Sequence, residues 1–164
     1  MKKSTIAYRV FGYNSPIGPL YCVFENTALI ELAINEKPVF ISELPESVPT
    51  LNNSFKAELD AYFKGELKEF AQKVKFASGT PFEQRIWRML RKVPYGETRS
   101  YKWIAGRVGS PGAMRAVGQA LGKNPLPIIV PCHRIIAADG SIGGFSSGVE
   151  AKRWLLEHEK TNKE

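Results

Sequence analysis

The sequence of 164 residues lacks any apolar run approaching the roughly 20 residues that a membrane-spanning helix needs. It also lacks internal repeats and low-complexity segments, and its basic start leads into alternating residues rather than into the solid apolar core of a secretion signal. With 43% hydrophobic and 24% charged residues, the chain has the composition of a folded protein. These features predict a soluble protein of the cytoplasm, or of the nucleus in a eukaryote, with no membrane partner.

Cysteine and histidine are rare, with two of each. Cys22 and Cys132 could form at most one disulfide, and neither belongs to a Cys-X-X-Cys pair. The sequence therefore indicates neither a disulfide scaffold nor a zinc site, and we expect no metal and no cofactor. Cys22 lies within a predicted strand, where a cysteine is usually a small buried apolar residue.

Basic residues are not spread evenly. Residues 1–79 contain nine Lys and Arg against nine Asp and Glu, whereas residues 80–164 contain 14 against seven and so carry the whole net charge of +7. A neutral half followed by a basic half favours contact of the second half with a polyanion such as a nucleic acid. Charge alone does not exclude a role in solubility.

The first half has the pattern of a small sheet followed by a helix. Its strand-like runs alternate or are rich in β-branched and aromatic residues, and turn residues separate them. A later segment places its apolar residues on one helical face. The predicted elements are strands at 4–13, about 19–25 and about 28–34, a loop at 36–50 with a short strand at 38–41, and a helix at 53–64.

The second half opens with a helix whose start is well marked. Thr80 can cap it, Pro81 suits its first position and Glu83 completes a capping box. Two shorter helices follow, at about 101–108 after Ser100 and at about 111–122, with a Gly-Ser turn between them. This spacing is typical of a helix-turn-helix, although an ordinary helical hairpin would look the same.

The predicted helix at 111–122 is rich in glycine and alanine. Gly118 costs roughly 1 kcal/mol of helix propensity, which suggests that another surface comes close to the backbone here. A slim helix of this kind would fit a narrow groove. Arg115 is the one long cation among the small side chains.

Cys132 has the most reactive-looking surroundings in the chain. Prolines bracket Ile128–Val130, which we predict to be a short strand, and His133 and Arg134 next to Cys132 could favour a thiolate. Adjacent residues of a strand point to opposite faces, so His133 would reach the sulfur through a turn or a water. Local chemistry leaves a reactive Cys132 and a buried structural one both open.

Four segments of the second half occur in a familiar order and spacing. They are RAVGQALGKNP at 115–125, IIVPCHRII at 128–136, GGFSSG at 143–148 and WLLEHE at 154–159. Together they resemble the O6-alkylguanine-DNA alkyltransferases. The match covers about residues 80–160, and residues 1–79 are similar to the variable first domain of that family mainly in length and element order.

The resemblance implies an α+β fold in two domains. Residues 1–79 would form a ribonuclease H-like scaffold of antiparallel sheet and helix, and residues 80–164 a mainly helical winged helix-turn-helix domain carrying the active site. The implied activity is irreversible, single-turnover transfer of an alkyl group from O6 of guanine, and from O4 of thymine, onto Cys132. The partner would be double-stranded DNA, bound by a monomer through the minor groove with the target base flipped out.

The resemblance also implies roles for individual residues. Cys132 would accept the alkyl group, His133 and Glu159 would relay its proton through a water, and Tyr101 would donate toward guanine N3. Asn124 would join the recognition helix to the active-site segment. The residues implied to contact substrate or DNA are Arg115, which would fill the space of the flipped base, Ala116, Arg134, the carbonyls of Cys132 and Ile135, Phe145 and the N–H of Ser146.

Two other readings stay open. Alkyltransferase-like proteins bind such lesions without repairing them, but they have another residue, commonly Trp, where this chain has Cys132. A Cys-His hydrolase would need a substrate cleft and an oxyanion hole, which a basic helix-turn-helix does not call for. Phe145 replaces a tyrosine of many relatives and Gly144 a polar residue of some, so the alkyl groups that the pocket accepts are left open. His158 we interpret as structural.

Overall fold

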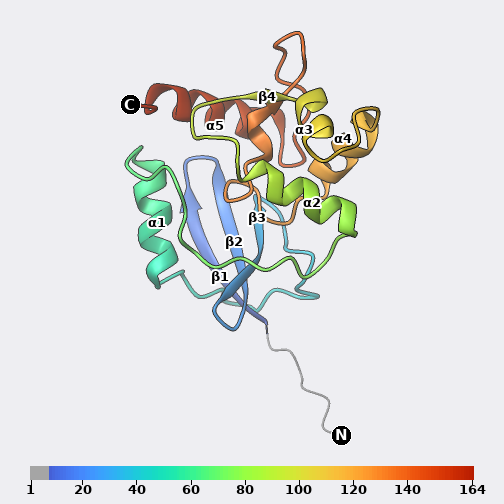
Figure 1. Ribbon diagram of the computed structural model, residues 1–164. Helices are drawn as coiled ribbons and strands as arrows, with labels where there is room; N and C mark the ends of the chain where they lie inside the picture. Colours follow the sequence, from blue (N-terminus) through green and yellow to red (C-terminus); the bar gives the residue numbers. More distant parts are fainter. Residues whose placement is uncertain (1–7) are drawn as a thin grey trace, which may run out of the picture.

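The computed structural model describes residues 8–164 (Figure 1). Its first half contains an antiparallel sheet in the order β1 (Tyr8–Ser15), β2 (Gly18–Glu25) and β3 (Ala28–Ile34). The three strands agree with the prediction, although the start of the strand predicted at 4–13 lies outside the described residues. The β3 strand is buried along its whole length, because other parts of the chain cover both of its faces.

The helix α1 (Ser54–Phe63) covers one face of this sheet. The ring of Phe55 in α1 meets that of Phe24 in β2 edge-on, with 6.3 Å between centroids. The short strand predicted at 38–41 is wrong. The N–H groups of Val39 and Phe40 donate to the buried carboxylate of Glu31 at 2.7 and 2.9 Å, so they do not join a strand ladder.

The second half contains α2 (Pro81–Leu90), α3 (Tyr101–Arg107), α4 (Met114–Gly122) and α5 (Val149–Thr161). The capping box at the start of α2 is present as predicted, and the Ser100 hydroxyl caps α3. The predicted start of the next helix at 111 is wrong. Residues 110–113 form a turn closed by a hydrogen bond from Ala113 N–H to the Ser110 carbonyl at 2.9 Å, and no side chain caps α4.

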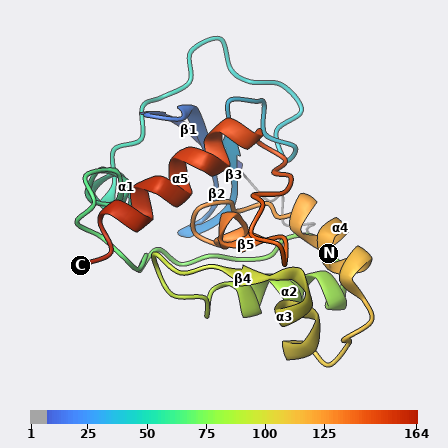
Figure 2. The ribbon, with the colours of Figure 1, turned by 90° about the horizontal axis from the view of Figure 1, so that it is seen from above.

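The two halves pack against each other and share one core. Figures 1 and 2 show α5 lying over the sheet and reaching α1, while α2, α3 and α4 gather at the other side of the molecule. The Leu32 N–H of β3 donates to the Pro125 carbonyl at 2.8 Å, just before the segment that carries Cys132. The α+β class is confirmed. No helix within residues 8–164 is long and apolar enough to cross a membrane.

Candidate active site

A short parallel ladder brings Tyr101 and Cys132 together. Arg99–Ser100 forms β4 and Ile135–Ile136 forms β5, with Ser100 opposite Ile136. Tyr101 follows β4 directly, and Cys132 lies one turn before β5, so both side chains reach the same place. The Ser100 side chain caps α3 so that the helix begins at Tyr101, and this fixes the backbone that carries the Tyr101 ring.

The segment before Cys132 is a buried loop, so the strand predicted at Ile128–Val130 is wrong. The N–H of Val130 donates to the Leu126 carbonyl, and the N–H of Cys132 donates to the Val130 carbonyl, both at 2.8 Å. These local turns form because the flanking prolines have no N–H for a ladder. The Ile128 backbone has φ of 77°, a left-handed conformation that a β-branched residue seldom adopts.

Asn124 closes this loop with its side chain. Its amide N–H donates to the Val130 carbonyl at 2.8 Å, and its amide oxygen accepts the Leu126 N–H at 2.9 Å. Asn124 follows Lys123, the C-cap of α4, so it ties the end of that helix to the residues just before Cys132. The side chain of Asn124 therefore links α4 to the segment that carries Cys132.

Cys132 begins a single turn of 3-10 helix, η1 (Cys132–Arg134), and forms part of a cavity wall. The cavity measures about 250 Å³. That is close to the lower limit of about 300 Å³ for typical small-molecule pockets, which suits one flat ring system. The lining residues come from α3, α4, η1 and the loop before α5, and they are Tyr101, Gly118, Leu121, Gly122, Cys132, Gly144, Phe145 and Ser146.

The thiol of Cys132 is protonated in the resting protein. Burial raises its pKa from 9.0 to about 11, and the Asn124 side chain and the Lys152 ammonium offset only part of that rise. The backbone N–H of His133 does favour the thiolate, as the sequence suggested, but burial outweighs it in the free protein. A base must remove the proton when the sulfur reacts.

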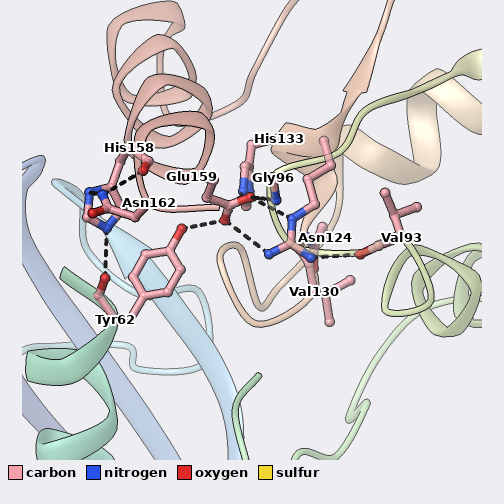
Figure 3. Close-up of polar contacts among 10 residues, drawn as sticks. Tyr62, Val93, Gly96, Asn124, Val130, His133, His158, Glu159 and Asn162 are labelled. Atoms are coloured by element: carbon pink, nitrogen blue, oxygen red, sulfur yellow. Dashed lines mark hydrogen bonds and ion pairs between the residues drawn. The ribbon is translucent and has the colours of Figure 1, made fainter. Parts of the chain in front are cut away.

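His133 and Arg134 both bind the carboxylate of Glu159 in α5 (Figure 3). His133 Nε2 lies 2.8 Å from Glu159 Oε2. The Arg134 guanidinium donates to the same carboxylate through two nitrogens, from Nε to Oε1 at 2.8 Å and from Nη2 to Oε2 at 3.0 Å. Its third nitrogen donates to the Val93 carbonyl at 2.8 Å. Arg134 is 7% exposed and its donors face inward, so the expectation that it contacts DNA or substrate is wrong.

The charge states in this cluster follow from burial and pairing. Burial lowers the pKa of His133, despite the opposing attraction of Glu159, so the imidazole is neutral. Burial pushes the pKa of Glu159 upward, but His133 and Arg134 outweigh it and hold that pKa well below its usual range. A neutral His133 then donates Nε2–H to the carboxylate. Its Nδ1 is buried with no hydrogen-bond partner within residues 8–164, which leaves a lone pair able to accept a proton.

Tyr101 is half-buried at the cavity, and burial, with the nearby Cys132, raises the pKa of its phenol. It therefore keeps its proton and can donate a hydrogen bond into the cavity. Phe145 and Ser146 also line the cavity. The Ile135 carbonyl already accepts a hydrogen bond from Lys152 Nζ at 2.7 Å, and the Cys132 carbonyl accepts one from the Ile135 N–H.

Arg115 and Ala116 lie in the first turn of α4, Arg115 exposed and Ala116 partly so. Farther along the helix, a Cβ atom added at Gly118 or Gly122 would meet nothing within 4 Å. These glycines therefore do not serve packing inside the protein. The slim face of α4 opens onto the cavity and is free to receive another molecule.

Sequence reasoning missed two residues that hold the site together. The Tyr62 hydroxyl of α1 donates to Glu159 Oε2 at 2.6 Å. Lys152 Nζ donates to two carbonyls, that of Ile135 at 2.7 Å and that of Gly144 at 3.2 Å. Neither has a motif of its own, since Tyr62 is one more aromatic residue on the apolar face of its helix and Lys152 one more cation. Among the described residues, no group of three or more His, Cys, Asp or Glu could hold a metal ion.

Two family models match the chain. The model described as 6-O-methylguanine DNA methyltransferase, DNA binding domain, matches residues 81–161. The model described as 6-O-methylguanine DNA methyltransferase, ribonuclease-like domain, matches residues 7–76.

Whole proteins and solved structures agree with these models. A methylated-DNA--protein-cysteine methyltransferase of Mycobacterium leprae is 47% identical over 153 residues, which cover 90% of this chain and 89% of that protein. The crystal structure of the Mycobacterium tuberculosis O6-methylguanine methyltransferase has a TM-score of 0.81 at 42% identity, covering 95% of this chain and 94% of the other. The M. tuberculosis OGT in complex with DNA has a TM-score of 0.81 at 43% identity, covering 94% and 93%.

Proposed function

The chain belongs to the 6-O-methylguanine DNA methyltransferase family, and from that premise we propose how its own residues carry out the repair. Its function is direct DNA repair by transfer of an alkyl group to a cysteine of the protein, and DNA is its partner. We propose that the acceptor is Cys132 and the lesion O6-alkylguanine. The observation that carries this is the position of Cys132 in the wall of the cavity, whereas Cys22 is completely buried in the sheet core.

The cavity implies that the target base leaves the duplex. A guanine O6 inside a base stack cannot reach the thiol of a cysteine that is only 5% exposed, so the base must be extruded. We propose that α4 lies in the minor groove and that Arg115 fills the gap left by the base. Extrusion costs a few kcal/mol, which contacts of Arg115 and the phosphates would offset. A single copy suffices, because one chain supplies α4, the cavity and the thiol.

The proposed reaction begins with removal of the thiol proton. The proton passes, through a water, to the free Nδ1 of His133, and the Glu159 carboxylate stabilises the imidazolium. Glu159 itself stays ionised, because Arg134 and His133 hold its pKa low. This role for the carboxylate is electrostatic and orienting.

The sulfur then attacks the alkyl carbon in line. A C–S bond forms as the C–O bond breaks, and the electron pair stays on O6 of guanine. Tyr101 donates toward N3 and the Ser146 N–H toward O6, which stabilises the charge that develops on the base. The carbonyls of Cys132 and Ile135 each have a second lone pair for the exocyclic amine. Because thiols do not cleave the resulting thioether, each molecule acts once.

We propose that residues 1–79 form the scaffold domain and residues 80–164 the domain that binds DNA. Intact mass measurement tests the central proposal. The protein is mixed with a duplex carrying one O6-methylguanine, and the mass should rise by one methyl group that maps to the Cys132 peptide. The Cys132→Ser variant retains Cys22 and should gain no mass. Tight binding of the lesion without any mass change would favour a lesion-binding protein that does not repair.

A further inference from the structure

The carboxylate of Glu159 is held from both halves of the chain (Figure 3). His133 and Arg134 approach it from η1, and the Gly96 N–H faces Oε1 at 3.4 Å. The fourth contact comes from the first half, where the Tyr62 hydroxyl donates to Oε2 at 2.6 Å. Oε2 is therefore shared by a tyrosine O–H and the imidazole N–H that the proposed proton relay uses.

Tyr62 is well fixed for this contact. It is fully buried at the end of α1, and its ring meets that of Tyr95 edge-on at 6.2 Å between centroids. Its backbone carbonyl accepts the Nε2–H of His158 at 2.7 Å, and that imidazole stacks on Trp154. The end of α1 is thus tied to α5 at two points, one of them Glu159 itself. His158 is structural, as its interpretation from the sequence expects.

We propose that Tyr62 is a positioning residue for alkyl transfer, acting through Glu159 on His133. The inference rests on the proposed roles of His133 and Glu159. A hydroxyl that donates to Oε2 stabilises charge on that oxygen and makes it a weaker partner for the imidazolium. It also holds the carboxylate in the plane where Oε2 meets His133 Nε2. The scaffold half would thereby contribute one functional atom to the reaction.

The hydroxyl is one of several groups that act on this cluster. Arg134 and His133 face Glu159 from η1, and Tyr95 approaches it from the loop after α2. Lys152 of α5 acts on both His133 and Cys132. Of these groups, Tyr62 is the one that the first half supplies. Removing its hydroxyl changes the cluster without changing any formal charge.

The test compares Tyr62→Phe with wild-type protein in single-turnover methyl transfer from a duplex, measured across pH. Transfer needs neutral His133, so the rate falls as pH drops through the pKa of that residue. Without the hydroxyl, Oε2 attracts the imidazolium more strongly, and the midpoint of this acid limb should move to higher pH. The rate at neutral pH should nevertheless fall about tenfold, which corresponds to ~1.4 kcal/mol, because the carboxylate is no longer held in the plane where Oε2 meets His133 Nε2. We expect this loss of positioning to outweigh the stronger attraction of Oε2 for the imidazolium.

Tyr13→Phe is the matched control. The Tyr13 hydroxyl donates to the Asp60 carboxylate at 2.7 Å, so the variant loses the same kind of bond in the same half, away from Glu159. It should keep the wild-type midpoint. Equal loss of stability in both variants, with unchanged midpoints and rates per folded molecule, would show that Tyr62 only docks α1 and would overturn the proposal. Wild-type protein that fails to accept methyl would instead refute the proposed function.

A second substitution covers the case in which Tyr62→Phe does not fold. Placing 3-fluorotyrosine at position 62 keeps the ring and the hydroxyl but makes the hydroxyl a stronger donor. The midpoint should then move to lower pH, opposite to the shift expected for Tyr62→Phe. A midpoint that stays at the wild-type value would overturn the proposal.

Discussion

Replacing Gly118 by alanine should make the protein more stable and a poorer repair protein. Gly118 lies in the middle of α4, its φ is not positive, and an added Cβ would meet no protein atom within 4 Å. Alanine is therefore accommodated without strain. Because glycine in a helix interior costs about 0.5–1 kcal/mol relative to alanine, the free energy of unfolding should rise by that amount. The melting temperature should rise by about 2–4 °C per kcal/mol gained.

The same methyl group occupies space that the substrate needs. Gly118 lines the cavity beside Tyr101 and Cys132, on the face of α4 that we assign to DNA. Overfilling a close contact costs about 1–3 kcal/mol, so repair at limiting duplex should slow by roughly tenfold or more. The expected signature is opposite movement of two quantities, with stability rising and repair falling.

Two assays and one control decide the outcome. Thermal unfolding measures stability, and single-turnover methyl transfer at several duplex concentrations measures repair. Gly106→Ala is the control, because Gly106 lies in α3, is equally open to a Cβ atom and does not line the cavity. It should stabilise the protein without slowing repair. If Gly118→Ala repaired DNA at the wild-type rate, α4 would not approach the substrate closely at this position.

Four further predictions concern the buried cluster and the DNA contact. Glu159→Gln leaves the Arg134 guanidinium buried without a counter-charge, so the free energy of unfolding measured by urea titration should fall by about 3 kcal/mol. A loss near zero would show that the two side chains do not form a buried ion pair. Burial lowers the pKa of His133 below its usual 6.5, so under acidic conditions the unfolded chain binds a proton that the folded chain excludes. The free energy of unfolding should therefore fall as the pH drops below about 6.5. A urea midpoint that does not change between about pH 7.5 and about pH 5 would contradict this. Alkylation of Cys132 by iodoacetamide, followed by peptide mass, should keep accelerating up to about pH 11, whereas a plateau near pH 9 would mean an ordinary thiol. Arg115→Ala should impair repair in duplex DNA far more than reaction with the free base, and equal losses would remove its role in base extrusion.

Local features of the sequence predicted most of the elements. The Thr80 and Glu83 capping box, the Ser100 cap and the alternating strand residues act between neighbours in the chain, so they can be read without a structure. The segment around Cys132 could likewise be identified from residue order. The strand predicted at 38–41 is wrong because the Glu31 carboxylate binds the N–H groups of Val39 and Phe40, whereas the strand predicted at Ile128–Val130 is wrong because local turns form there.

Only the tertiary structure decided how the site works. The sequence by itself pointed to the residues that we propose to carry the chemistry, since Cys132 and His133 are adjacent and Glu159 ends a recognisable segment. It could not show that Arg134 faces inward, that burial keeps the thiol protonated or that Tyr62 reaches Glu159. Burial and side-chain contacts between distant residues depend on how the whole chain packs, and no local pattern encodes them.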